Sequence, residues 1–191
     1  KERKMPKKTV LFMSGSSQVG SSNWRMVGAA AALADRDMAD AFTAVTLNLA
    51  EYELPVFIEG QPGPVLDDAA KLRKAVAAAD AIFMSSDEYT GAFSSVFRNA
   101  AGWIGHDVDG AGNLFQGKLI TLCGAPVGGV GALRGHPALH QFLLELGANV
   151  YSQKFELGST SRIFRQDGSL SPAVQKQLAE GAFARLTGEI A

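Results

Sequence analysis

The sequence lacks the features that mark secreted and membrane-spanning proteins. It contains a single cysteine, Cys123, which excludes an internal disulfide framework and suits a reducing compartment, so we expect a cytoplasmic protein. No stretch approaches the roughly 18 uninterrupted apolar residues that a membrane span needs, and we expect no membrane partner. The N-terminus also lacks the apolar segment of a secretory signal.

A large excess of charge of one sign is missing as well. The net charge is −1, but five of the 18 basic residues and one of the 19 acidic residues lie in the first eight residues, KERKMPKK. The rest of the chain has a net charge of −5, which argues against nucleic acid as a partner. We expect residues 1–8 to be a basic arm or a cloning remnant, with Met5 as the natural start. With 191 residues, 47% of them hydrophobic, we expect residues 9–191 to form one domain.

Short apolar runs alternate with segments of helical character. Strands are predicted at 9–14, 43–49, 81–86, 118–123 and 148–152. Helices are predicted at 21–33, 66–79, 94–104 and 132–146, followed by a last helix that Ser171 caps and Pro172 begins. This alternation predicts an α/β fold: a flavodoxin-like, doubly wound parallel sheet of five strands in the order 2-1-3-4-5, with helices on both faces.

Three loops follow the first, third and fourth predicted strands, at 14–23, 86–93 and 124–135. In such sheets the ligand lies outside the carboxyl ends of the strands, where the strand order reverses, and these loops converge there. All three are rich in small residues, so a ligand can approach the backbone closely. We therefore expect the functional site at this edge.

The first loop contains GSSQVGSS, in which Gly15 and Gly20 have the spacing of a P-loop. Ser21 stands where a nucleoside triphosphatase has its lysine, which argues against triphosphate hydrolysis. Two interpretations stay open. The hydroxyls, amides and helix N-terminus hold a terminal phosphate, or the segment is a serine-rich turn with a capping serine.

The third loop contains an incomplete dinucleotide-binding pattern. Gly129 and Gly131 supply G-x-G, but Arg134 stands at the third glycine position. The loop is either a strand-to-helix turn or a cofactor contact.

Each of the three loops also opens a longer block with a recognisable pattern. The first block fits G-S-x-R-x-x-S-x-N at Gly15, Ser16, Ser21 and Asn23, with Gln18 at the arginine position. The second, DEYTGAFSSVFRNAAGW, fits P-E-Y-N-G-S-x-P-x-x-x-K-N-A-x-D-W at Glu88, Tyr89, Gly91, Asn99, Ala100 and Trp103. The third fits G-A-S-x-G-x-x-G-x-x-R at Gly124, Ala125, Gly128, Gly131 and Arg134. Together they resemble the NADPH-dependent FMN reductase family, which includes quinone, chromate and azo-dye reductases, over about residues 9 to 170.

The resemblance implies a flavoenzyme in which bound FMN carries a hydride from NADPH or NADH to a small-molecule electron acceptor, without a metal. It places the FMN phosphate on Ser16, Gln18, Ser21, Ser22 and Asn23. It places the flavin ring against Asp87, Glu88, Tyr89, Thr90 and Gly91, flanked by Ala125, Pro126 and Gly128. Arg98 and Arg134 are candidates for the NADPH phosphates, or alternatively form surface salt bridges. The resemblance further implies a homodimer or homotetramer, with the 50–65 loop reaching toward a partner subunit or serving as a connector.

Four positions depart from the family pattern. Gln18 replaces arginine, Asp87 proline, Thr90 asparagine and Pro126 serine. The first and last remove hydrogen bonds to FMN, so we expect looser binding or a shifted acceptor range. Asp87 either lies near the ring, is turned away or pairs with Arg98. These departures keep an alternative open: a flavodoxin-like protein that binds FMN or another phosphate ligand without efficient turnover.

The remaining chemically active residues favour structural roles. His136 and His140 have the spacing of two metal ligands on one helix face, but no third ligand is evident. The segment that contains His106 and Asp107 is expected to be a polar surface loop, and Cys123 an inert core residue. Phe93, Phe97 and Trp103 are expected in the core, with some of them available to a dimer face.

Overall fold

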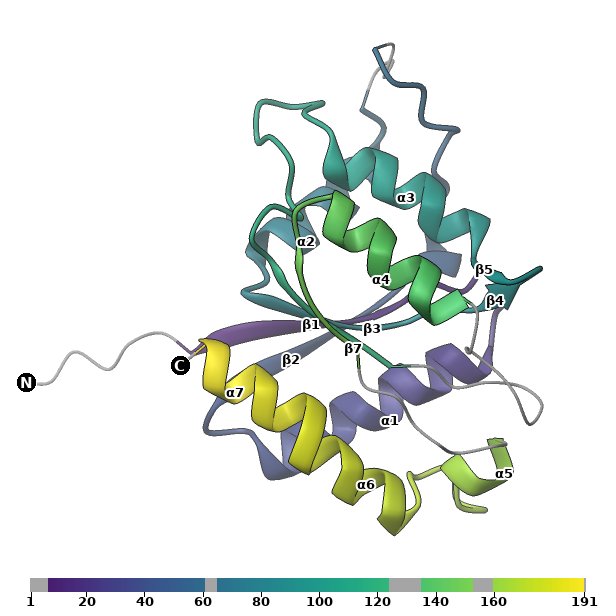
Figure 1. The fold of residues 1–191 in the computed structure, drawn as a ribbon, viewed down its shortest axis with the longest axis vertical. Coiled ribbons are helices and arrows are strands. Elements are labelled where there is room, and N and C mark those ends of the chain that lie inside the picture. Colours follow the sequence, from purple (N-terminus) through teal and green to yellow (C-terminus); the bar gives the residue numbers. More distant parts are fainter. Residues whose placement is uncertain (1–6, 61–64, 124–134, 153–159, 191) are drawn as a thin grey trace, which may run out of the picture.

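A computed structural model describes residues 7–60, 65–123, 135–152 and 160–190 (Figure 1). Five parallel strands form the main sheet in the order β2-β1-β3-β6-β7. Their bounds are β1 (Lys8–Ser14), β2 (Phe42–Asn48), β3 (Ala81–Ser85), β6 (Leu119–Leu122) and β7 (Asn149–Ser152). In chain order this is 2-1-3-4-5, so the predicted topology is confirmed.

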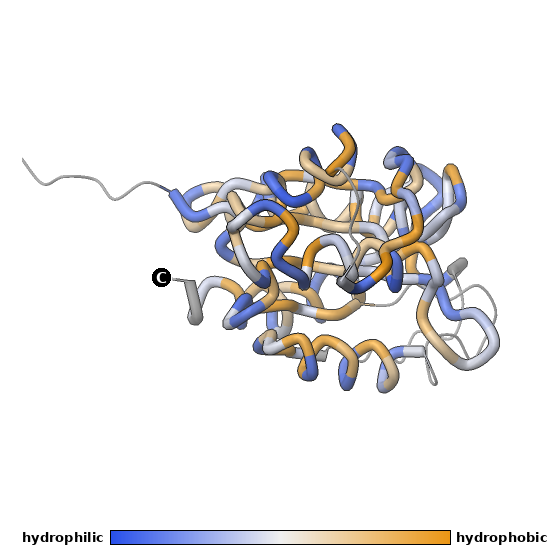
Figure 2. Tube along the Cα trace, turned by 90° about the horizontal axis from the view of Figure 1, so that it is seen from above, coloured by the Kyte–Doolittle hydropathy of each residue, from blue (hydrophilic) through white to orange (hydrophobic). Residues whose placement is uncertain are grey.

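Helices cover both faces of the sheet. In Figure 1, α2, α3 and α4 lie on one face, and α1, α6 and α7 lie on the other. The helices are α1 (Ser22–Asp37), α2 (Asp67–Ala78), α3 (Ser95–Gly105), α4 (Gly135–Glu145), α5 (Thr160–Ile163), α6 (Pro172–Leu178) and α7 (Ala184–Ile190), with a 3₁₀ turn η1 (Leu49–Glu51) and a π-helical turn η2 (Ala179–Phe183). Figure 2 shows helices at the rim alternating between hydrophobic and hydrophilic residues, as expected when one side of a helix is buried.

Each face of the sheet has its own hydrophobic core. On the α1 side, four phenylalanine rings pack with centroids 5.0 to 6.5 Å apart, those of Phe12, Phe42, Phe83 and Phe183. On the α3 side, Phe97 is fully buried and packs edge-on against Phe115. Trp103 is also buried, so both aromatic residues of α3 lie in the interior, as predicted.

Several details differ from the predicted elements. The first helix continues four residues beyond its predicted end, because Ala34 keeps the buried face intact. Pro172 begins α6 and Ser171 is its N-cap residue, as predicted. The Ser171 hydroxyl, however, donates to the backbone oxygen of Arg162 at 2.8 Å and makes no capping hydrogen bond to the helix. The segment 86–93, expected to be a loop, contains a short antiparallel pair, β4 (Glu88–Tyr89) and β5 (Ala92–Phe93).

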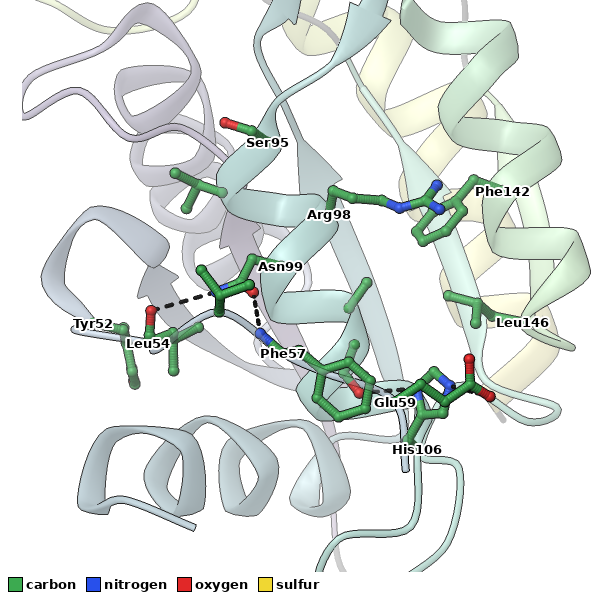
Figure 3. A pocket seen from close by; sticks show the side chains of 14 residues that line it. Tyr52, Leu54, Phe57, Glu59, Ser95, Arg98, Asn99, His106, Phe142 and Leu146 are labelled. Carbon is green, nitrogen blue, oxygen red and sulfur yellow. Dashed lines mark hydrogen bonds and ion pairs between the residues drawn. The ribbon is translucent and has the colours of Figure 1, made fainter. Parts of the chain in front are cut away.

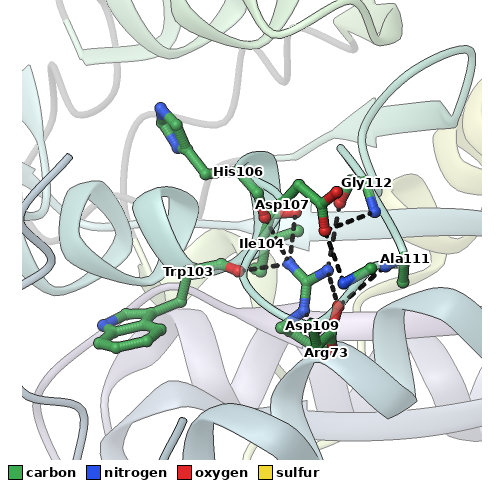
Figure 4. Close-up of polar contacts among 9 residues, drawn as sticks. Arg73, Trp103, Ile104, His106, Asp107, Asp109, Ala111 and Gly112 are labelled. Carbon is green, nitrogen blue, oxygen red and sulfur yellow. Dashed lines mark hydrogen bonds and ion pairs between the residues drawn. The ribbon is translucent and has the colours of Figure 1, made fainter. Parts of the chain in front are cut away.

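A buried arginine fixes the segment after α3 (Figure 4). Arg73 of α2 is 2% exposed and makes a bidentate ion pair with Asp109, with nitrogen-to-oxygen distances of 2.6 and 2.8 Å. It also donates to the backbone oxygens of Trp103 at 2.6 Å and of His106 at 2.9 Å, which satisfies carbonyls at the end of the helix. The polar loop predicted around Asp107 is therefore anchored to the interior of the protein by the buried guanidinium of Arg73.

Candidate functional site

The first loop joins the end of β1 to the start of α1. The Gly15 amide donates to the Ser85 oxygen at 2.8 Å, which ties the loop to β3. The buried Ser16 hydroxyl accepts from the Gln18 amide at 3.1 Å, and Gly20 takes a left-handed conformation with φ of 73°. The Ser21 hydroxyl caps α1 by accepting from the Trp24 amide at 3.0 Å, so the capping serine is confirmed.

This loop also offers hydrogen-bond donors to a ligand. Within the described part of the chain, the backbone N–H groups of Ser17, Val19 and Gly20 have no hydrogen-bond partner, and all three residues are exposed. They precede the N-terminus of α1, whose dipole favours an anion. The residues present therefore fit a phosphate by dipoles and hydroxyls, while Gln18 supplies no charge.

The second loop forms a tight hairpin between β4 and β5. Tyr89 pairs with Ala92, which leaves Thr90 and Gly91 as a two-residue turn. Their φ values are 53° and 79°, the left-handed signs of a type I′ turn. Thr90 is the only residue other than glycine with positive φ among those that the structure describes. Since the resemblance has asparagine there, a residue that tolerates this conformation, the departure at position 90 affects backbone geometry.

A chain of polar side chains connects the first loop to the hairpin. Asn23 donates its amide to one oxygen of Asp87, and its own oxygen accepts from the Ser85 hydroxyl at 2.6 Å. The Tyr89 hydroxyl donates to the other Asp87 oxygen at 3.4 Å and accepts from the side-chain amide of Gln18 at 3.2 Å. The expected site residues of the first two loops are thus brought together, and Asp87 is turned toward Asn23 and Tyr89.

Glu88 connects the hairpin to the start of α4. Its carboxylate accepts from the Gly135 amide, the first residue of α4, at 2.9 Å. A Cβ at position 135 would lie 3.0 Å from the Glu88 side chain and 3.2 Å from the Ala92 oxygen, so the helix start and the hairpin are closely packed. The side chain of Glu88 therefore positions the hairpin.

Other expected site residues lie elsewhere. Ala125, Pro126, Gly128 and Arg134, with Gly129 and Gly131, lie outside the described residues. Arg98 is exposed, and its guanidinium lies 4.6 Å from the centre of the Phe142 ring. Among the described residues it makes no ion pair, with Asp87 or any other carboxylate. Arg98 remains accessible to an anion.

Two matched motif residues hold the loop that follows η1. Asn99 accepts from the Phe57 amide at 2.8 Å and donates to the Pro55 oxygen at 2.9 Å. The Trp103 indole donates to the same Pro55 oxygen at 2.9 Å. A Cβ at position 102 would lie 2.5 Å from the Phe57 ring, so Gly102 permits this contact. The sequence resemblance gave no indication of this role.

The anchored loop forms one wall of a pocket of about 720 Å³, with α3 and the end of α4 as the others (Figure 3). Arg98, Asn99 and His106 supply polar groups to a lining that is mainly apolar. Val56 and Ile58 on the loop are 79% and 56% exposed. This face therefore presents apolar side chains beside a recess.

Cys123 lies beyond the end of β6, where its side chain is buried and free. Burial raises the pKa of its thiol well above the ordinary value, so the unreactive thiol form persists. None of the helices in the described ranges is long and apolar enough to cross a membrane.

The sheet order and the two loops that meet at its switch point define a flavodoxin-like protein, and the first of these loops has the exposed N–H groups and helix N-terminus that fit an anion. The chain belongs to the NADPH-dependent FMN reductase family, whose model matches residues 8–161. Members of this family are oxidoreductases that use FMN with NAD(P)H as electron donor.

Individual relatives agree with this assignment. The chain is 26% identical to an NAD(P)H-dependent FMN reductase of Pseudomonas aeruginosa over 172 residues, which cover 90% of this chain and 89% of that protein. Its fold is similar to that of FerB, a flavoenzyme NAD(P)H:(acceptor) oxidoreductase from Paracoccus denitrificans, with a TM-score of 0.78, 21% identity and coverage of 96% and 97%. An NADH:FMN oxidoreductase, EMOB, in its apo form matches with a TM-score of 0.69, 12% identity and coverage of 97% and 91%.

Proposed function

We propose that the protein is an FMN-dependent NAD(P)H oxidoreductase that passes a hydride from NAD(P)H through bound flavin to a small acceptor such as a quinone, an azo compound or free flavin. The observation that carries the proposal is the junction of the first loop with the β4–β5 hairpin at the carboxyl ends of β1 and β3, linked through Asn23 and Asp87. The single buried cysteine fits a reducing compartment such as the cytoplasm.

In this proposal the chain's own residues bind and orient the cofactor. Ser16, Ser21, Ser22, Gln18 and Asn23 surround the phosphate with hydroxyls and amides. The two-residue turn at Thr90 and Gly91 presents backbone N–H groups to the ring, with Ala125, Pro126 and Gly128 completing the contact. FMN, when bound, supplies the carrier for the two electrons. Arg98 and Arg134 are the proposed partners of the NAD(P)H phosphates.

The test is NAD(P)H oxidation with added FMN against a panel of quinones, azo dyes and free flavin. A Ser22→Asp variant places a negative charge at the start of α1, where it favours the helix but repels a phosphate, and we expect a loss of FMN binding and turnover. Ala173→Asp makes the same kind of change at the start of α6, on an exposed position, and leaves both unchanged. Flavin binding without oxidation of NAD(P)H by any acceptor would favour the alternative of a flavodoxin-like binding protein.

We also propose that two chains pair through the face that contains the pocket of Figure 3. The exposed Val56 and Ile58 on the loop support this choice. Ile58→Asp should lower the mass measured by light scattering after size exclusion. Val45→Asp, at an exposed position of the edge strand β2, is the matched control. A homotetramer in both variants would place the main interface elsewhere.

A further inference from the structure

Asp87 lies where the first loop meets the hairpin, and its carboxylate accepts one hydrogen bond from each side. One oxygen accepts from the Asn23 amide at the start of α1. The other accepts from the Tyr89 hydroxyl, which in turn accepts from the Gln18 amide. Both amide side chains proposed to hold the FMN phosphate are therefore connected to one carboxylate, Asn23 directly and Gln18 through Tyr89.

This carboxylate is not neutralised by a neighbouring cation in the described part of the chain. The ion pairs there involve other acidic residues, and Arg98 lies over the Phe142 ring. The chain also has Gln18 where the family pattern has arginine. Relative to that pattern, the first loop has lost a positive charge and the second has gained a negative one, and both changes lie on the same chain of hydrogen bonds.

We propose that Asp87 makes the flavin site weakly selective for the phosphate, so that FMN and unphosphorylated riboflavin bind with similar affinities. A phosphate held by Asn23 would share that amide nitrogen with the carboxylate. The Asn23 side-chain nitrogen has two hydrogens, so the phosphate and the Asp87 carboxylate can each accept one of them. The two negative groups then lie close together and repel each other. Riboflavin lacks the phosphate and meets no such repulsion. The inference rests on the proposed flavin-binding function.

The test compares the two flavins on the full chain freed of bound flavin, by quenching of flavin fluorescence. The wild type should bind FMN and riboflavin within about tenfold of each other, whereas Asp87→Asn should bind FMN about tenfold more tightly and riboflavin unchanged. Asparagine keeps the shape: its side-chain oxygen can still accept from Asn23, and its NH2 group can donate to the Tyr89 hydroxyl oxygen. Asp40→Asn removes an exposed carboxylate beyond the opposite end of α1 and should change neither affinity.

A second variant keeps the test decisive if Asp87→Asn fails to fold. Gln18→Arg adds the missing charge at the other end of the hydrogen-bond chain and should also tighten FMN more than riboflavin. Equal tightening of both flavins by Asp87→Asn, or no change in their ratio in either variant, would overturn this inference and leave the proposed function intact. If neither flavin binds to the wild type or to any variant, the inference and the proposed function fail together.

Discussion

The turn of the β4–β5 hairpin contains a residue that is poorly suited to its backbone conformation, which makes a sharp prediction about stability. Thr90 has φ of 53°, and a left-handed conformation costs an L-residue roughly 1–2 kcal/mol, with β-branched residues among the least tolerant. Its hydroxyl makes no hydrogen bond to any described residue, so replacing it loses no such contact. Thr90→Asn should therefore raise the free energy of unfolding by about 1 kcal/mol, or the melting temperature by about 2–4 °C.

The measurement is urea unfolding followed by circular dichroism, with two control variants. Thr90→Val keeps the branched side chain and should bring no gain. Thr46→Asn makes the same chemical change on the exposed face of β2, where asparagine is a poorer strand residue, and should lower stability slightly. The reasoning is refuted if Thr90→Asn is no more stable than the wild type, or if Thr90→Val gains as much.

Three further predictions concern the packing described above. Gly102→Ala should destabilise the fold by about 1–3 kcal/mol because its methyl group meets the Phe57 ring, whereas Gly28→Ala in the open surface of α1 should stabilise it, as measured by urea unfolding. The hydrogen bond from Arg73 lowers the pKa of the Asp109 carboxyl below its ordinary value. The ion pair therefore stabilises the fold fully at a pH above the ordinary pKa of aspartate, and this stabilisation is lost as the pH falls through the lowered pKa. Asp109→Asn should flatten the acid limb of stability against pH, and an unchanged limb would contradict this. Cys123 should react with a thiol reagent at a rate limited by unfolding, and rapid labelling of the native protein would show that its burial is incomplete.

The sheet was predictable because its strands are long enough to show as apolar runs. The β4–β5 hairpin was missed because its strands have two residues each, too few for an alternating pattern, and its turn carries threonine where a sequence signal would need asparagine. Arg73 was missed for a different reason. Its partners are mostly backbone oxygens of a distant segment, which leave no trace in residue types.

The meeting of the first two loops was predictable from the sequence, but the hydrogen bonds that join them were not. The family resemblance predicts that Asn23 and Gln18 contact a phosphate, and this stays a prediction. The structure shows that both side chains are linked to Asp87, Asn23 directly and Gln18 through Tyr89. Such a link depends on side-chain directions from three segments, which loop composition does not determine. The division of the chain into residues 1–8 and one domain at 9–191 stays a prediction, although β1 begins at Lys8.

The contacts of Asn99 and Trp103 affect how motif matches in this family should be interpreted. Both residues belong to the block that signals an FMN reductase, yet their hydrogen bonds hold the segment around Pro55 against α3. A homologue whose flavin pocket had decayed would keep these two residues for as long as it kept that segment. A motif match at positions 99 and 103 therefore reports that this loop is retained, and does not by itself report that flavin is bound. Positions 18, 87 and 90 are the ones to inspect when the question is whether a family member retains its flavin.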